Sequence, residues 1–424
     1  MGQDESSASI RRPAAILALL ALASFLNSYD RSIFPIILEP MKHDLALTDT
    51  EIGLLVGPAF AVLFALVSIP MAGFADKGRR AAVLSWAMGF WSLMTALCGL
   101  ATNFLTMAFG RFGVGAGEGA GGPSINALAA DAFGGRRLAT VLSVIVVAAN
   151  LGSAAALLGG GLLSDAFGWR SVFIVGGIGG VIVALAIGLG LPRAPAPPPN
   201  HAMQSASMVA RFSILFRRPA FALLCAGIGL SSIGLSAFTA WGPAFFIRKF
   251  GVTPGEVGAT YGVIHGILAL LIPVAAGHLS DHFARRKASA PAMMLVAIIL
   301  ISVPVNIAFL LAPTFTLALI LVVPLAALHL AIVPPYYALI QSLAGPHLRS
   351  SAAAISGAAI YLMGYGVGPP LVGFLSDSFG WSGGVQSLER AMLVSVVSYI
   401  GGGTMFYLCA RHVEAGQRAA SEQS

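Results

Sequence analysis

Long apolar runs follow one another along almost the whole chain and are separated by short polar breaks. A membrane-spanning helix needs about 20 consecutive, mainly apolar residues, and twelve runs reach that length. The pattern therefore predicts an all-α membrane protein with twelve transmembrane helices. We expect these helices at residues 14–38, 51–75, 81–101, 104–130, 138–163, 170–191, 219–247, 256–278, 290–312, 315–342, 350–375 and 388–410.

The polar breaks carry residues that begin helices or exclude them. Thr48-Asp49-Thr50-Glu51 and Thr253-Pro254-Gly255-Glu256 each place a glutamate three residues after a threonine, the pattern of a capping box at a helix start. The longest break contains RAPAPPPN at 193–200, whose prolines exclude a spanning helix and suit a linker. We predict an N-terminal six-helix bundle, a cytoplasmic linker and a C-terminal six-helix bundle at 1–192, 193–218 and 219–424.

The two halves of the chain repeat each other. The capping-box segment at Thr48 aligns with the one at Thr253, a shift of 205, and the same shift carries Asp76 onto Asp281. GLLSDAFGW at 161–169 matches GFLSDSFGW at 373–381, a shift of 212. Two such bundles, related by an axis along the membrane normal, place a substrate site at their interface near the middle of the membrane. They also imply alternating access by rocking.

Composition and charge agree with a membrane protein. Only 10% of residues are charged, 57% are hydrophobic and the mean hydropathy is +0.86, whereas a soluble domain carries about 25% charged residues. With both termini inside the cell, the inner segments hold 17 Lys and Arg residues and the outer segments 5. This asymmetry sets the orientation and explains the net charge of +7 without a nucleic-acid partner. We expect a monomer in the inner (plasma) membrane, surrounded by the lipid bilayer.

The ionisable residues that lie deepest in the predicted spans of the N-terminal half are Asp30, Arg31, Arg111 and Glu118. Each costs about 2.5–3.5 kcal/mol at a helix centre on insertion scales, so such residues persist when they pair, face water or serve a function. One interpretation is a structural ion network. The other is proton coupling, because burial raises the pKa of a carboxyl group and a nearby arginine lowers it. We predict that the two carboxylates bind protons and that the two arginines are their switching partners.

Further polar and aromatic residues are candidates for substrate binding. In the N-terminal half, Arg111 can meet an anionic headgroup, Asn27 lies one turn before Asp30, and Asn150 either binds substrate or makes an interhelical hydrogen bond. The odd-numbered glycines from 113 to 121 favour close helix packing. In the C-terminal half, an aromatic cluster is formed by Phe238, Trp241, Phe245 and Phe246. It is either a belt at the membrane interface or the lining of an apolar cavity. The candidates there are Phe238, Trp241, His265, His329, Tyr336, Tyr337 and Gln341, with tyrosines also at 361 and 365.

The whole chain resembles the major facilitator superfamily of transporters. The loop at Asp281, with Gly277, Arg285 and Arg286, fits that family's Gly-x-Leu-Ala-Asp-Arg-x-Gly-Arg-Arg signature. The loop at Asp76 departs from it, since Ala72 and Arg79 stand where glycines belong. The resemblance implies that these loops latch the two bundles together on the cytoplasmic side in the outward-facing state. The latch residues would be Asp76, Arg80, Asp281, Arg285 and Arg286.

Two motifs resemble the bacterial spinster-like branch of lipid transporters. They are Asn27-Ser-Tyr-Asp30-Arg31, and the segment from Arg111 to Glu118 followed by Pro123 and Ala-Asp-Ala-Phe at 130–133. Slightly altered forms occur in organic-anion/proton symporters of the superfamily. The resemblance implies a proton-coupled secondary transporter for a lipid-like amphiphile of the lysolipid or sphingoid type. The alternative is a symporter of small organic anions such as sugar acids.

The sequence favours neither an enzyme nor an ATP-driven pump. It has no phosphate loop ending in Lys-Ser/Thr, and GVGAGEGAGG at 113–122 lacks the preceding strand and distal acid of a dinucleotide site. Cys98, Cys225 and Cys409 stand singly in apolar runs, so no metal or redox spacing exists. We therefore expect no cofactor and no metal.

Overall fold

The structure is a computed structural model and describes residues 13–74, 80–133, 138–191, 208–345, 348–379 and 385–421. Within these ranges every regular element is a helix, which confirms the all-α prediction. The N-terminal half contains α1 (Pro13–Asp44), α2 (Asp49–Val56), α3 (Pro58–Phe74), α4 (Arg80–Cys98), α5 (Phe104–Phe133), α6 (Leu138–Phe167) and α7 (Trp169–Gly190).

The C-terminal half follows the same plan with more interruptions. After the short helix α9 (Met208–Phe216), which falls in the predicted linker, it contains α10 (Pro219–Phe250), α11 (Pro254–Val257), the π-helical turn η3 (Gly258–Gly262), α12 (Val263–Ala284), α13 (Ala290–Leu310), α14 (Phe315–Ala331), α15 (Val333–Ala344), α16 (Arg349–Ala359), the π-helical turn η4 (Ile360–Tyr365), α17 (Gly366–Ser378) and α18 (Val385–Ser421).

Eleven of the twelve predicted spans coincide with helices that are long and apolar enough to cross a membrane, within the described part of the chain. The twelfth, at 104–130, coincides with α5, a helix of 30 residues. It is not among those helices, and its glycines, Arg111 and Glu118 interrupt its apolar run. The helix is therefore confirmed there, and its crossing of the membrane stays a prediction.

Four predicted spans are interrupted. The span at 51–75 is two helices that meet at Gly57-Pro58, and the span at 315–342 divides at Ile332, just before Pro334-Pro335. The spans at 256–278 and 350–375 contain η3 and η4, and π-helical turns of this kind are often found at functional sites. Both predicted capping boxes are present, with Thr48 and Glu51 on α2 and Thr253 and Glu256 on α11.

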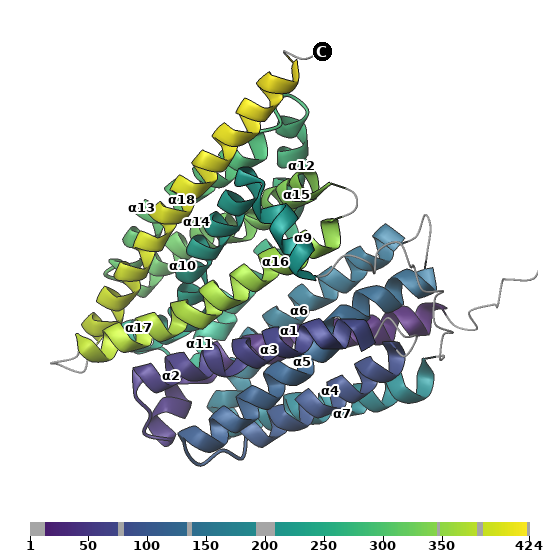
Figure 1. The fold of residues 1–424 in the computed structure, drawn as a ribbon. Coiled ribbons are helices and arrows are strands. Elements are labelled where there is room, and N and C mark those ends of the chain that lie inside the picture. Colours follow the sequence, from purple (N-terminus) through teal and green to yellow (C-terminus); the bar gives the residue numbers. More distant parts are fainter. Residues whose placement is uncertain are drawn as a thin grey trace, which may run out of the picture.

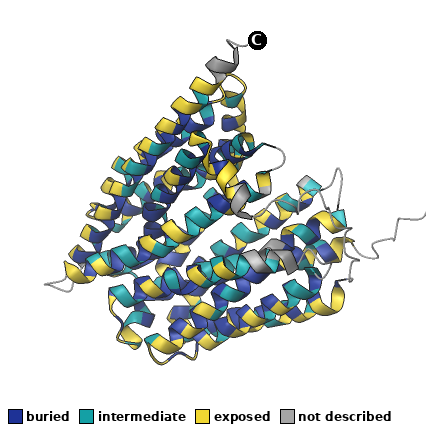
Figure 2. Cartoon of the chain, viewed as in Figure 1, coloured by how far each residue is buried: buried dark blue, intermediate teal, exposed yellow. Residues whose placement is uncertain are grey.

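The two halves of the molecule lean on each other at one end and diverge at the other (Figure 1). They meet where α2, α11 and α17 lie, which we call the closed end. They diverge where α1 begins and where α9 and α15 lie, which we call the open end. Buried positions follow the inner sides of the helices, and exposed positions follow their outer sides (Figure 2). The exposed side chains include many large apolar ones, such as Trp86 and Leu189, as expected for lipid-facing surfaces.

Close packing at the closed end occurs twice, in equivalent places of the two halves. A Cβ atom added to Gly373 on α17 would lie 2.2 Å from the carbonyl oxygen of Asp49 on α2. A Cβ atom added to Gly161 on α6 would lie 2.3 Å from the carbonyl oxygen of Pro254 on α11. The glycines are related by the shift of 212 and their partners by the shift of 205. The sequence repeat is therefore also a repeat of contacts between the halves.

Hydrogen bonds at the closed end follow the same repeat. Asp377 on α17 accepts hydrogen bonds from the backbone N–H groups of Asp49 (3.1 Å) and Thr50 (2.7 Å), at the start of α2. Asp165 on α6 accepts one from the N–H of Gly255 (2.9 Å), at the start of α11. Free N–H groups and the helix dipole both favour a carboxylate at a helix N-terminus. Each half thus caps a helix of the other half.

Candidate functional site

Arg31 and Glu118 form an ion pair inside the N-terminal half. The Nε atom of Arg31 on α1 lies 2.5 Å from Oε2 of Glu118 on α5. The Glu118 side chain is fully buried, whereas 31% of the Arg31 side chain is exposed. The other carboxylate oxygen, Oε1, has no hydrogen-bond partner among the described residues. The structure therefore joins two of the four predicted charges directly and leaves the carboxylate with an unused acceptor.

Arg31 also reaches the C-terminal half. Its Nη1 donates a hydrogen bond to the hydroxyl of Tyr361, on the π-helical turn η4. The guanidinium lies over the rings of Phe64 (5.1 Å), Phe60 (5.6 Å) and Tyr361 (5.6 Å). Such cation–π contacts are favourable, most of all where water is excluded. Arg31 thus connects a buried carboxylate of one half to a tyrosine of the other.

Asp30 is bonded to Thr95 and not to Glu118, the partner of Arg31. Its Oδ2 accepts a hydrogen bond from the Thr95 hydroxyl on α4 (3.2 Å), and its Oδ1 has no partner within the described residues. Only 4% of Asp30 is exposed. The charges of Glu118 and Arg111 both act on it through space. Asp30 is therefore a buried carboxylate without an ion pair in the described part of the chain.

Arg111 is positioned by the backbone and by rings. Its Nε donates to the carbonyl oxygen of Leu55 on α2 (3.3 Å), and its guanidinium lies over Phe34 (4.8 Å) and Phe60 (5.2 Å). Only 5% of it is exposed. The four predicted charges therefore do not form one closed network, although Phe60 lies between Arg31 and Arg111 and contacts both.

The glycines of α5 allow this cluster to form. Added Cβ atoms at Gly115 and Gly119 would lie 2.3 Å and 2.6 Å from the carbonyl oxygens of Phe60 and Phe64 on α3. The glycines at 113, 117 and 121 lie equally close to Met94 or Trp91 on α4. The packing prediction for these glycines is confirmed. Close approach of α3 is what brings Phe60 and Phe64 beneath the Arg31 guanidinium.

A cavity of about 240 Å³ lies inside the C-terminal half. Three of the predicted binding residues, Phe238, His265 and His329, line it. Nε2 of His329 and the hydroxyl of Tyr399 are 3.0 Å apart and share a hydrogen bond. Tyr365 also lines the cavity, and its ring stacks on that of Tyr361 with 5.8 Å between centroids. A pair of stacked tyrosines therefore connects the wall of the cavity to the Arg31 cluster.

The other predicted binding residues have different surroundings. Asn150 on α6 donates to the carbonyl oxygen of Ala269 on α12 (2.9 Å), so the interhelical interpretation holds in this conformation. Trp241 is fully buried and donates to the carbonyl oxygen of Pro369 (3.1 Å), which rules out its place in a lipid-facing belt. Asn27 is half-buried, and its Nδ2 is without a partner in the described ranges.

Tyr336, Tyr337 and Gln341 all lie on α15, beyond the interruption at Ile332. Tyr336 is 2% exposed, and its ring contacts that of Tyr337, which is 47% exposed. Gln341 is half-buried. None of these three residues lines the 240 Å³ cavity.

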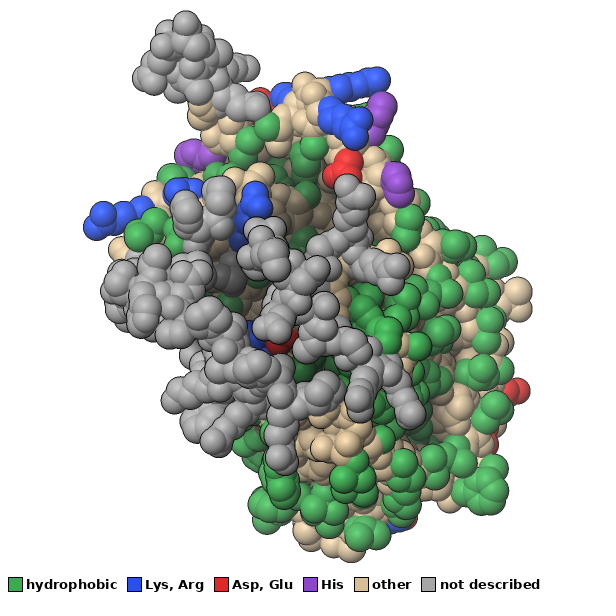
Figure 3. Space-filling view, turned by 90° about the vertical axis from the view of Figure 1, so that its right-hand side faces the viewer, with side chains coloured by type: hydrophobic (Ala, Val, Ile, Leu, Met, Phe, Trp, Pro, Cys, Tyr) green, Lys and Arg blue, Asp and Glu red, His purple; other side chains and the backbone are tan. Residues whose placement is uncertain are grey.

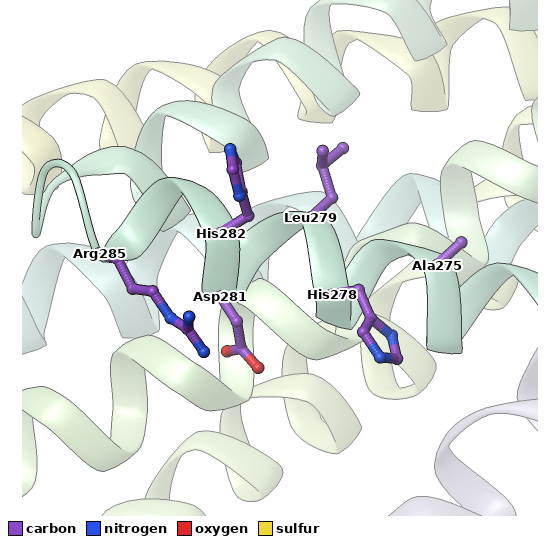
Figure 4. Close-up of a pocket in the computed structure, with 6 residues that line it drawn as sticks. All are labelled: Ala275, His278, Leu279, Asp281, His282 and Arg285. Carbon is purple, nitrogen blue, oxygen red and sulfur yellow. The ribbon is translucent and has the colours of Figure 1, made fainter.

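The predicted latch residues that the structure describes lie in two separate groups, one on each half. Asp76 lies outside the described residues. Arg80 pairs with Asp131 of its own half, its Nη1 lying 2.6 Å and 2.7 Å from the two carboxylate oxygens. Asp281 and Arg285 line an opening of about 520 Å³. They project from one side of α12 together with His278, as Figure 4 shows.

Basic and His side chains gather along one side of the open end (Figure 3). Arg286, the last of the predicted latch residues, is exposed near this end, just after α12. In the described part of the chain, no hydrogen bond or ion pair joins the Asp281 loop to the N-terminal half. The resemblance implies that the latch is closed in the outward-facing state. A latch whose two parts are separated therefore agrees with a different state.

The sequence did not identify the ion pairs of the closed end. Arg248 on α10 bonds to Glu39 on α1 and Asp49 on α2, and it was visible only as an outer-loop charge. Asp165 and Asp377 stand in the repeated GLLSDAFGW and GFLSDSFGW segments, so the repeat was a usable signal for them.

No group of three or more His, Cys, Asp or Glu residues is arranged to hold a metal ion within the described ranges.

Comparison with known proteins gives relatives along almost the whole chain. The chain is 34% identical to an MFS-type efflux pump of Mycolicibacterium smegmatis, over 92% of this chain and 90% of the relative. It is 25% identical to a hexuronate transporter of Bacillus subtilis, over 89% and 92%. It is 23% identical to a sphingosine-1-phosphate transporter of Danio rerio, over 94% and 84%.

Among solved structures, the fold is similar to a bacterial homologue of the human lysosomal transporter spinster, in an inward-facing and unoccupied conformation. The TM-score is 0.87 at 25% identity, over 96% of this chain and 98% of that one. The spinster resemblance inferred from sequence is therefore confirmed, and the chain is a multi-pass membrane transporter and not an enzyme. The profile of the Major Facilitator Superfamily matches residues 20–364, and the chain belongs to this family.

Proposed function

We propose that the chain is a proton-coupled secondary active transporter that works by alternating access and carries an amphiphile with an ionic head, of the lysolipid or sphingoid type. One observation carries this proposal. Arg31 contacts a fully buried carboxylate, Glu118, in one half and the hydroxyl of Tyr361 in the other. A change in the charge of Glu118 therefore alters the position of Arg31, and with it the contact that Arg31 makes with the other half.

The coupling step is a change of partner at Arg31. When Glu118 takes up a proton, its carboxyl is neutral and the attraction that holds Arg31 weakens. Arg31, already partly exposed, is then free to meet an anionic group or to change its contact with Tyr361. Asp30 precedes Arg31 in the sequence and is buried without an ion pair in the described chain, so it is a second proton site. Loss of the proton restores the ion pair.

Alternating access follows from the two ends of the molecule. The closed end is held by hydrogen bonds between the halves, whereas at the open end the described parts of the two halves diverge (Figure 1). With the orientation set by Lys and Arg, the open end is cytoplasmic and the conformation is inward-facing. The cell's inner membrane is the location that agrees with this orientation.

The distribution of polar and apolar groups supports an amphiphilic cargo. The buried charges lie in the N-terminal half, and the cavity lined by aromatic rings lies in the C-terminal half. A molecule with an ionic head and an apolar part matches both surfaces. The relative from Danio rerio carries sphingosine-1-phosphate, which is such a molecule.

A small organic anion is the second candidate cargo. The cavity of about 240 Å³ suits a small molecule, whereas a long acyl chain would extend beyond it. Arg31 offers a single, partly exposed guanidinium, which suits one carboxylate. The relative from Bacillus subtilis carries hexuronates, which are small carboxylates.

Transport by reconstituted protein tests the proposal. Thermal-shift screening of lysophosphatidylcholine, sphingosine and galacturonate first selects a cargo. Uptake into liposomes is then driven by an imposed pH gradient, with a pH-sensitive dye inside. We expect Glu118→Gln and Asp30→Asn to lose the pH-driven component at least tenfold, while Glu389→Gln, which removes a carboxylate from an ion pair away from the cluster, retains it. Full pH-driven uptake by both cluster variants would exclude the coupling role.

A further inference from the structure

The 240 Å³ cavity of the C-terminal half has walls unusually rich in rings. Phe238 comes from α10, Tyr261 from η3, His265 from α12, His329 from α14 and Tyr365 from η4. The Phe238 ring meets those of His329 (5.2 Å) and Tyr261 (6.4 Å) edge to face. Ring edges and faces arranged in this way are complementary to a further aromatic ring.

Two polar atoms in this wall have no partner among the described residues. They are Oγ of Ser232 on α10 and Nδ1 of His265 on α12. Ser232 is 3% exposed, so water does not reach it freely. Buried polar groups are normally hydrogen-bonded, and an unpaired one calls for an explanation. Hydrogen-bonding groups on a ligand in the cavity would supply the partners that these two atoms lack.

The volume limits what the cavity encloses. An apolar cavity of about 150 Å³ holds one benzene molecule. A cavity of about 240 Å³ therefore has room for a substituted ring or two fused rings.

We propose that this cavity is a binding subsite for an aromatic group of one or two rings that bears a hydroxyl or carbonyl, and that Ser232 and His265 hold that substituent. Tyr365 in its wall stacks on Tyr361, which bonds to Arg31. Arg31, whose side chain is 31% exposed, is the cation next to this tyrosine pair, so the cargo that suits the cavity and the cluster together is an aromatic hydroxy or oxo anion. This inference rests on the proposed transport function and selects its second candidate cargo, an organic anion, over the lysolipid or sphingoid type.

Equilibrium binding to the purified full-length chain in lipid nanodiscs tests the subsite without transport. The probes are 2-naphthoate and 6-hydroxy-2-naphthoate, measured by calorimetry. We expect the hydroxylated probe to bind at least fivefold more tightly, because a site built to hydrogen-bond a hydroxyl discriminates against the analogue that lacks it. Ser232→Ala and His265→Phe each reduce this preference, and together they abolish it.

The control is Ser231→Ala. Ser231 is adjacent, equally buried and also without a hydroxyl partner in the described chain, but it does not line the cavity. It should keep the full preference. The inference is overturned if neither probe binds, if both bind the native chain equally, or if the double variant keeps the preference.

A second variant tests the volume independently of hydrogen bonds. Ala326 on α14 lines the cavity and is 3% exposed, so Ala326→Leu fills part of it. We expect at least a fivefold loss in affinity for 2-naphthoate. Val323→Leu, on the outer side of the same helix, should have no effect. Equal binding by both variants would overturn the subsite. These binding results are independent of pH-driven uptake, so a failure of proton coupling is recognised separately.

Discussion

Arg248 on α10 donates two hydrogen bonds to the carboxylate of Asp49 at the start of α2, each 2.7 Å long. Its Nε donates a third, of 2.6 Å, to Glu39 on α1. The Arg248 side chain is 13% exposed, and those of Asp49 and Glu39 are 4% and 6% exposed. Bidentate, charge-assisted contacts are among the stronger hydrogen bonds. This arginine of the C-terminal half therefore secures two helices of the other half at the closed end.

Replacing Arg248 should open the closed end. Arg248→Gln leaves Glu39 and Asp49 buried without their partner on α10, although Lys42 still contacts Asp49. Removing one member of a buried ion pair costs about 3–5 kcal/mol, and that penalty falls on the closed conformation alone. We expect a longer distance between spin labels at His43→Cys and Ser378→Cys, measured by double electron–electron resonance. The three native cysteines are buried and should not compete for the label.

The matched control for this experiment is the neighbouring Lys249. It pairs with Glu389 on α18, so both members of that pair belong to the C-terminal half. Lys249→Gln should leave the distance distribution unchanged. An unchanged distribution in the Arg248→Gln protein would show that the ion pair does not hold the closed end.

Capping carboxylates from the opposite half should matter more for conformation than local caps. Asp377→Ala with Asp165→Ala removes the caps that each half lends to the other. Thr48→Ala with Thr253→Ala removes caps of the same helix starts that come from the helices themselves. Losing an N-cap costs about 0.5–2 kcal/mol. We expect both pairs to lower thermal stability and only the aspartate pair to lengthen the spin-label distance. A longer spin-label distance in the threonine variant as well would show that the aspartates have no special role in holding the closed end.

The helical organisation was readable from sequence because a membrane helix needs a long apolar run, whatever its neighbours are. The same holds for the repeat, which predicted two bundles and placed Asp165 and Asp377 in equivalent segments. The helix of α5 was predicted from the same pattern, although its glycines and two charges lower its hydropathy and its crossing of the membrane stays a prediction. Its glycines nevertheless predicted close packing correctly, since only small residues allow backbones to approach.

The partners of the charged residues were not readable. Arg31, Glu118 and Tyr361 come from α1, α5 and η4, and their contact depends on how the helices rotate and on how the halves sit in one conformation. The sequence grouped four charges without showing which of them pair. In the structure Arg111 instead bonds to the Leu55 carbonyl and lies over two phenylalanine rings. Backbone and ring partners of this kind leave no mark in the pattern of charges.

Tyr361→Phe should weaken coupling without disturbing packing. The substitution keeps the ring, which lies 4.5 Å from that of Phe64, and removes only the hydroxyl that accepts a hydrogen bond from Arg31. We expect pH-driven uptake into liposomes to fall several-fold, while exchange of cargo between equal concentrations on both sides persists. Thermal stability should change little. Tyr365→Phe is the control, because Tyr365 stacks on Tyr361 without contacting Arg31 by a hydrogen bond in the described structure. Equal loss in both variants would show that the Tyr361 hydroxyl has no special role.

Gly115→Ala should destabilise the protein, whereas Gly159→Ala should not. A Cβ atom at position 115 would lie 2.3 Å from the Phe60 carbonyl oxygen, so α3 must move away from α5. Overpacking of this kind costs about 1–3 kcal/mol, and it displaces the ring that contacts both Arg31 and Arg111. At Gly159, on the exposed side of α6, an added Cβ atom meets nothing within 4 Å, and replacing glycine by alanine inside a helix gains up to about 1 kcal/mol. Thermal unfolding in detergent measures both changes. A Gly115→Ala protein as stable as the native chain would mean that α3 and α5 are less tightly packed than their backbone contact implies.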